Sequence, residues 1–251
     1  MEQLAFTALL NRLFGAQVLA LLQALHIHPK HPATPISNPF AMELLVVLLL
    51  TIFFIAVRTQ LSVERPGALQ HTMEGIHGFI ENLAQEIIGH HSARFVPYLT
   101  VLGMFILTCN LLGLVPGLES PTAVEIVPLG AALLTWFYYH YSGIREHGVF
   151  GYLKHFIGPQ EGMPLAVRIF LPIIIFPIEI FSHAARVLSL SVRLFANMFA
   201  GEMVTLVFFS LIPVGLPVIF QGLHIFVAFI QTYIFVLLPT VYLGEAMAHE
   251  H

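Results

Sequence analysis

The chain has 251 residues, of which 57 % are apolar and only 10 % charged, and its net charge at pH 7 is −4. Soluble domains carry about a quarter charged residues, so the composition excludes one, and nothing basic suggests a nucleic-acid partner. Cys109 is the only cysteine, so no intramolecular disulfide can form, and we expect it to be a small buried hydrophobic side chain. The predicted fold class is an all-α polytopic membrane protein.

Residues 1–38 are expected to form an N-terminal extra-membrane or interfacial segment. Glu2 stands where a signal peptide carries positive charge, and no small-residue cleavage site follows the apolar patch. A helix over residues 4–25 that lies on the membrane surface fits this pattern better. The Pro-rich residues 31–39 then act as a linker, and residues 39–251 form a single membrane domain.

About five membrane-crossing helices are predicted in this domain. The predicted spans cover residues 40–57, 95–115, 124–141, 164–211 and 216–246. Between them, residues 69–89 are expected to form an interfacial helix and residues 143–163 a polar loop.

The basic residues predict the orientation. Two connections are flanked by basic residues, namely Arg58, Arg65, Arg94, Arg145, Lys154 and Arg168. The connection between the second and third spans has neither Lys nor Arg. By the positive-inside rule the basic connections are cytoplasmic, so the N-terminus is expected in the periplasm and the C-terminus in the cytoplasm.

Residues 164–211 are too long for one upright span. A continuous helix of this length would extend about 70 Å, more than twice the roughly 30 Å hydrocarbon core. We expect the segment to be strongly tilted, broken or partly outside the membrane. Two helices joined near Pro172 or Pro177 are the alternative.

A narrow polar stripe follows one face of this segment. At about 100° per residue, its members fall within about 40° of Arg193. The stripe consists of Glu179, Ser182, Arg186, Ser189, Arg193 and Asn197. Because polar groups in hydrocarbon are costly, the stripe should face protein or a water-filled cavity.

Arg193 is the most informative residue of the stripe. A mid-membrane Arg costs about 2.5–3.5 kcal/mol on insertion scales, and Arg cannot lose its proton. No carboxylate lies three or four residues away, Glu202 falls on the opposite face, and Glu179 is about 21 Å distant along the axis. The counter-charge is therefore expected from another helix or chain; an Arg that binds only backbone carbonyls is the alternative.

The last segment carries a second polar set. His224 and Gln231 are seven residues apart and share a helix face, with Glu245 further along. His can change its charge near neutral pH, as a proton relay requires. A buried structural histidine is the alternative, but the presence of Glu202 in the preceding helix favours the relay.

Residues 191–202, Ser-Val-Arg-Leu-Phe-Ala-Asn-Met-Phe-Ala-Gly-Glu, resemble the signature of subunit a of the rotary F-type ATP synthase. In that family an Arg, an Asn four residues later and an acid or His nine residues later recur. Residues 110–116 resemble the family's second-span motif, and residues 224–235 its last helix. The order and spacing agree over about residues 38–248.

The resemblance implies a proton-translocating stator subunit of the Fo sector, which is not itself an enzyme and needs no cofactor. Two offset half-channels would load and unload protons on the carboxylates of the c-ring, with Arg193 between them, so that proton flow drives rotation and ATP synthesis. The last two helices would lie nearly horizontal, packed as a hairpin against the c-ring. Peripheral-stalk b subunits and the lipid bilayer of the bacterial inner membrane are the other expected partners.

The resemblance also implies roles for single residues. Those assigned to proton translocation, mostly in the outer half-channel, are Arg193, Asn197, Glu202, His224, Gln231 and Asn110. Candidates for the cytoplasmic half-channel are Glu179, Ser182, Ser189 and His183. Further candidates are Glu125, Arg186 and Glu245; Glu125 stands one position away from an acid or amide in many members.

Two other function classes fit the sequence less well. A secondary transporter with a buried Arg should show an internal repeat, but residues 1–125 contain no counterpart of the polar stripe. An intramembrane enzyme should carry a motif such as His-Glu-x-x-His or Gly-x-Ser-x-Gly, and the sequence has neither. No metal site is therefore predicted. Copurification with a ring of small proteins would distinguish a stator subunit from an enzyme.

Overall fold

The computed structural model describes residues 3–26, 31–62, 66–115, 117–155, 165–211 and 215–248. All regular secondary structure in these ranges is helical, as the composition predicted. The elements in order are α1 (Ala5–Ala24), α2 (Asn38–Thr59), α3 (Ala68–Ile88), η1 (Gly89–Arg94), α4 (Val96–Leu112), η2 (Pro121–Ala123), α5 (Ile126–His155), α6 (Leu165–Leu211) and α7 (Leu216–Met247).

Four of the described helices are long and apolar enough to cross a membrane, and a bent helix pair would make a fifth. The four are α1, α2, residues 170–211 of α6, and α7, and the pair is α3 with η1 and α4. This agrees with the prediction of an all-α polytopic membrane protein with about five crossings. Two details differ: α1, expected on the surface, qualifies by length and apolarity, whereas α5, expected to span, is not among the qualifying helices.

The predicted interfacial helix and the second span are one bent pair. The axis turns by 115° between α3 and α4. Gly89, where α3 gives way to η1 before this bend, has φ +80°, a left-handed conformation that glycine adopts without steric cost. The chain can therefore change direction sharply after the polar helix α3 and enter the apolar helix α4.

The predicted polar loop 143–163 is wrong in its first part, because α5 continues to His155; residues 156–164 lie outside the described ranges. Gly148 interrupts the helix with φ 72° and ψ 165°. The chain then folds back, so that the hydroxyl of Tyr152 lies 2.8 Å from Nδ1 of His140. The ring of Tyr152 packs directly on Gly143, where a side chain would collide with it. Gly143 and Gly148 thus allow residues that were expected to form a loop to form a helical segment packed on the earlier part of α5.

Helix α6 is a single helix of 47 residues that contains both Pro172 and Pro177. The alternative of two helices joined at a proline is therefore wrong. Each proline removes one backbone hydrogen bond and crowds the preceding turn, but in an apolar environment the remaining backbone groups have no water to bond instead, so the helix persists. At about 1.5 Å per residue it extends roughly 70 Å.

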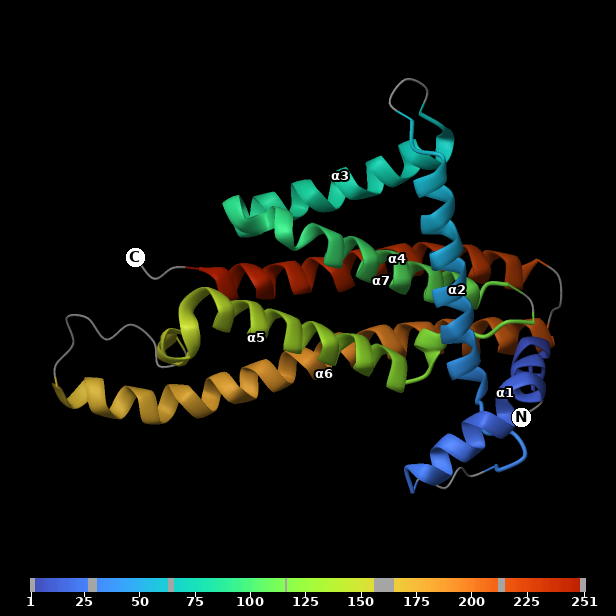
Figure 1. Cartoon of the computed structure of the whole chain (residues 1–251), viewed down its shortest axis with the longest axis horizontal. Coiled ribbons are helices and arrows are strands. Elements are labelled where there is room, and N and C mark those ends of the chain that lie inside the picture. The colour runs from blue at the N-terminus through green and yellow to red at the C-terminus, as the bar shows by residue number, and fades with distance from the viewer. Residues whose placement is uncertain are drawn as a thin grey trace. The chain divides into compact units, whose positions relative to one another are not determined.

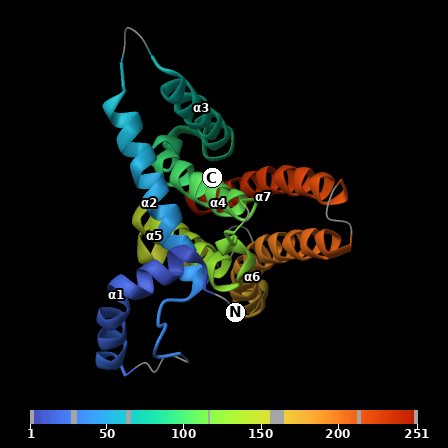
Figure 2. The same ribbon diagram turned by 90° about the vertical axis from the view of Figure 1, so that its right-hand side faces the viewer.

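The chain forms two compact units, and α4, α6 and α7 each contribute to both. The first unit contains residues 1–71, 104–124 and 196–230. Its core packs α1, α2 and the end of α4 around Met42, Val46 and Cys109, and Cys109 is fully buried, as predicted. The end of α6 and the start of α7 lie side by side in this unit (Figure 2).

The second unit contains residues 72–103, 125–195 and 231–251. Its core joins α3, the start of α4, α5 and the end of α7 around Phe95, Leu99, Tyr139 and Leu243. Helix α5 runs along the first part of α6 in this unit (Figure 1). The expected pairing of the last two helices is thus seen in each unit separately: through Gly201 and His224 in the first, and Arg186 and Glu245 in the second.

Candidate functional site

Arg193 lies on an exposed face of α6, in the second unit. Its guanidinium donates a hydrogen bond to the hydroxyl of Ser189, one turn earlier, at 3.3 Å. No salt bridge joins it to a carboxylate in the described part of the chain, whereas Arg94 pairs with Glu146 and Arg186 with Glu245. Because Arg does not lose its proton, Arg193 keeps a positive charge on the exposed face of an apolar helix, where an anion of another chain could pair with it.

The polar stripe around Arg193 shares one helix face because α6 is unbroken. Towards its N-terminal end, Nε2 of His183 lies 3.4 Å from Oε1 of Glu179, an i,i+4 pair that is an ion pair when His183 is protonated. Ser182 is half-buried and Ser189 is exposed. These candidates for one half-channel therefore follow a single edge of α6.

Arg186 and Glu245 form an ion pair between α6 and α7. The guanidinium of Arg186 also lies over the ring of Tyr242, 4.8 Å from its centroid. On α7, Gln231 is buried in the second unit. Arg186 and Glu245 thus hold the two helices together and, unlike Arg193, neutralise each other.

Glu202 is held by the loop between α4 and η2 in the first unit. Its Oε1 accepts a hydrogen bond from the backbone N–H of Ser120 at 3.1 Å. The carboxylate lies so close to Gly113 that a Cβ there would stand 2.7 Å from Oε1. A carboxylate that would otherwise be costly in an apolar helix is therefore placed in a tight polar recess.

Asn110 belongs to the same polar network. Its Oδ1 accepts from the hydroxyl of Thr122 at 2.6 Å, and its Nδ2 donates to the backbone carbonyl of Ala228 on α7 at 3.4 Å. The hydroxyls of Thr122 and Ser120 lie 2.7 Å apart. The chain of hydrogen bonds from Asn110 to Ser120 thus supports the loop that binds Glu202.

His224 lies on α7 and is buried. Its ring packs against Gly201 of α6, where a Cβ would stand 3.0 Å from the ring. His224 and Asn197 line a mainly apolar cavity of about 260 Å³. Glu202 bonds to Ser120, and Nε2 of His224 has no hydrogen-bond partner among the described residues, so a proton would need an intermediate group or water to pass between Glu202 and His224.

Glu125, which stands one position away from the acid or amide of many family members, is exposed at the start of α5. No cluster of three or more His, Cys, Asp or Glu side chains that could hold a metal ion is found among the described residues.

The structure adds residues that the sequence analysis missed. Gly113, Ser120 and Thr122 surround Glu202 and Asn110, and their role depends on contacts between α6 and a loop some 80 residues earlier. Tyr139 and His140 join His183 from α5. The adjacent aromatic and imidazole side chains of residues 138–140 were the available signal, but their partner helix could not be read from spacing.

Comparison with known proteins agrees with these motifs. The sequence model of the family described as ATP synthase A chain matches residues 40–244. The chain is 55 % identical over 250 residues to ATP synthase subunit a of Koribacter versatilis, which covers 100 % of this chain and 99 % of that protein. It is 47 % identical over 219 residues to ATP synthase subunit a of Solibacter usitatus, covering 87 % of this chain and 91 % of that protein. It is also 41 % identical over 196 residues to ATP synthase subunit a of Aquifex aeolicus, covering 74 % of this chain and 86 % of that protein.

These matches confirm the family expected from residues 191–202 and cover nearly all of the described helices. The chain, with its several apolar helices, is a multi-pass membrane protein and belongs to the ATP synthase A chain family, that of ATP synthase subunit a.

Proposed function

We propose that the chain is the proton-translocating stator subunit of the Fo sector, and that Arg193 separates two offset half-channels. Membership of the family supports a place in a complex with other Fo subunits. The observation that carries the assignment to Arg193 is that this residue is exposed on α6 and forms no salt bridge with a carboxylate in the described ranges, although Arg94 and Arg186 do.

In this proposal the anion that Arg193 meets is a membrane carboxylate on the rotating ring of c subunits. An adjacent guanidinium favours the ionised form of a carboxylate, and its own proton is not lost in an apolar environment. Each ring carboxylate would therefore release its proton before it passes Arg193. The same fixed charge would prevent protons from leaking straight from one half-channel to the other.

The proposed outer half-channel contains groups of the first unit, and the resemblance of residues 224–235 to the family's last helix adds Gln231 to the proposal. The Glu202 carboxylate and the His224 imidazole are groups able to exchange protons. Asn110 and Asn197 lie near them, in the polar network and the 260 Å³ cavity respectively. The cytoplasmic half-channel would follow Glu179, Ser182 and Ser189 on the stripe of α6, with His183 beside Glu179.

We further propose the bacterial inner membrane as its location, with a periplasmic N-terminus and a cytoplasmic C-terminus, and peripheral-stalk b subunits as additional partners. The positions of the basic residues support this orientation. In the complex this chain would conduct protons, while the reaction on ATP takes place on other subunits.

The test is ATP-driven proton pumping in inverted membrane vesicles that contain the intact complex. Arg193→Ala should abolish pumping while the complex still assembles, because no other described residue supplies the charge at this place. Arg145→Ala is the matched control, since Arg145 is an exposed Arg on α5 outside the stripe, and it should pump normally. Normal pumping by Arg193→Ala would overturn the proposed function.

A further inference from the structure

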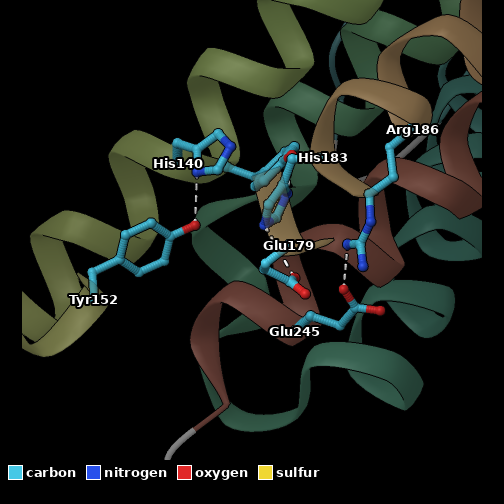
Figure 3. A network of polar contacts seen from close by, with 7 residues as sticks. His140, Tyr152, Glu179, His183, Arg186 and Glu245 are labelled. Carbon is cyan, nitrogen blue, oxygen red and sulfur yellow. Dashed lines mark hydrogen bonds and ion pairs between the residues drawn. The ribbon is translucent and has the colours of Figure 1, made fainter. Parts of the chain in front are cut away.

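A cluster of proton-exchanging side chains lies between α5, α6 and α7 in the second unit (Figure 3). The hydroxyl of Tyr139 lies 2.7 Å from Nδ1 of His183, and the other ring nitrogen of His183 faces Glu179 at 3.4 Å. On the opposite side, Nδ1 of His140 lies 2.8 Å from the hydroxyl of Tyr152. Tyr139, His140 and Tyr152 of α5 lie outside the family motifs at residues 110–116, 191–202 and 224–235.

The two imidazoles are close neighbours. The ring centroids of His140 and His183 are 4.7 Å apart, and Tyr139 stacks on His183 at 5.7 Å. Two imidazolium ions at this separation would repel each other strongly in a partly buried site. The pair is therefore suited to carry one additional proton and not two.

The charges around the pair favour that single proton. The cavity beside His183 is lined by Tyr139 and Tyr152 from α5, Glu179 and Arg186 from α6, and Tyr242 and Glu245 from α7. The described charged groups that line the cavity are thus two carboxylates and one guanidinium, and Arg186 already pairs with Glu245. Glu179 is then the carboxylate beside His183, and a positive charge on His183 would neutralise the charge of Glu179.

Water has access to the cluster. The residues that line it enclose a cavity of about 30 Å³, which is room for one or two water molecules. His183 is 12 % exposed and Glu179 is 35 % exposed. A proton can therefore reach His183 from solvent through a water in the cavity and need not cross apolar side chains.

We propose that His183 and His140 form a proton-storage site that holds one proton on the imidazole pair and exchanges it with Glu179. The inference rests on the proposed function, which places Glu179 in the cytoplasmic half-channel. A hydronium ion in the cavity gives a proton to the hydroxyl of Tyr139, which passes its own proton to Nδ1 of His183, and the Nε2 proton passes to the carboxylate of Glu179. Only N–H and O–H bonds form and break: the hydronium becomes water, and His183 is left neutral as the Nδ1–H tautomer.

Tyr139 and Tyr152 are the positioning residues of the site. A hydrogen bond to Nδ1 sets the ring orientation and the tautomer of a histidine. With the Tyr139 hydroxyl donating to Nδ1, neutral His183 carries its proton on Nε2, aimed at Glu179. Tyr152 orients His140 in the same way, and its own position depends on the chain reversal at Gly148.

The test measures ATP-driven proton pumping by the intact complex in inverted vesicles between pH 6 and pH 8.5 of the medium. With His183→Gln, pumping should fall about tenfold or more at the alkaline end, where protons are scarce and a storage group matters most. The fall should be less than about twofold near pH 6, where free protons suffice. His140→Gln should change the profile in the same direction but less strongly. His77→Gln, an exposed His on α3, is the matched control and should leave the profile unchanged.

Tyr139→Phe provides a second variant that keeps the ring and removes only the hydroxyl. It should also reduce pumping more at alkaline than at acidic pH, with an unchanged amount of complex. If His183→Gln and Tyr139→Phe lower pumping equally at all pH values, or not at all, the cluster is structural and the proposal is overturned. Arg193→Ala in the same vesicles tests the proposed function separately, because its expected effect is complete at every pH.

Discussion

Gly113 lies directly against the carboxylate of Glu202. A Cβ at position 113 would stand 2.7 Å from Oε1 of Glu202 and 2.7 Å from Cβ of Ser120, closer than such atoms approach in folded proteins. The residue that holds the carboxylate, Ser120, is itself hydrogen-bonded to the backbone carbonyl of Cys109. The absence of a side chain at Gly113 is therefore what lets the Glu202 carboxylate enter its recess.

Gly113→Ala should displace the Glu202 carboxylate or the loop at Ser120, and with it the group proposed to exchange protons. A shift of about 1 Å in a reacting group can lower a rate roughly hundredfold, so proton flux should fall by roughly ten- to a hundredfold. The measurement is passive proton conductance of the membrane sector in vesicles. Gly130→Ala is the control, because nothing lies within 4 Å of a Cβ there, and it should conduct normally.

The shorter side chain of Asp offers a rescue of that variant. Gly113→Ala combined with Glu202→Asp should conduct better than Gly113→Ala alone, because Asp withdraws the carboxylate from the added methyl group. If Gly113→Ala conducts like wild type, the close contact has no part in proton transfer.

Arg193→Lys should stop proton-driven ATP synthesis even though the positive charge is formally kept. Lys can lose its proton when it is desolvated, and it lacks the planar fork of Arg, so it would not hold a ring carboxylate ionised. Arg94→Lys is the matched control, since Arg94 is partly exposed and pairs with Glu146, and it should support synthesis. Normal synthesis by Arg193→Lys, at a normal amount of complex, would refute the role assigned to Arg193.

Glu202→Gln and His224→Gln should each slow passive proton conductance strongly, and the double variant should be little worse than the slower single one. Groups that act in series as a unit are not additive. Proton transfer between the two would need an intermediary, because the carboxylate bonds to Ser120 and the imidazole packs on Gly201. Fully additive losses would assign the two residues to separate roles and return His224 to a structural one.

Single cysteines should report the orientation of the chain when Cys109, which is buried, is first replaced by Ser. Ser120 is buried and Gly148 has a left-handed backbone conformation, so a Cys is unsuitable at either position. Their exposed neighbours Glu119 and Val149 are used instead. Glu119→Cys should react with a membrane-impermeant thiol reagent from the periplasmic side, and Val149→Cys only from the cytoplasmic side. The reverse pattern would invert the orientation inferred from the basic residues.

Much of the fold was predictable because it depends on local composition. Apolar runs long enough to span a bilayer predict helices, since only a helix satisfies every backbone group within one segment. The bounds of α2 and α7 accordingly lie within two residues of the predicted spans at 40–57 and 216–246. The isolation of Arg193 from carboxylates on its own helix was also predictable, because helical geometry alone determines which residues lie one turn away.

The tertiary structure decided what depends on contacts between distant segments. Spacing could not show whether the prolines break α6, because that depends on whether alternative backbone partners exist. Spacing also could not show that the chain reverses at Gly148 and brings Tyr152 to His140. It also could not show that Ser120 and Gly113 form the recess for Glu202. The reversal depends on the left-handed conformation of Gly148 within α5, and the recess on packing between segments far apart in sequence, where a single glycine or hydroxyl determines which polar groups meet.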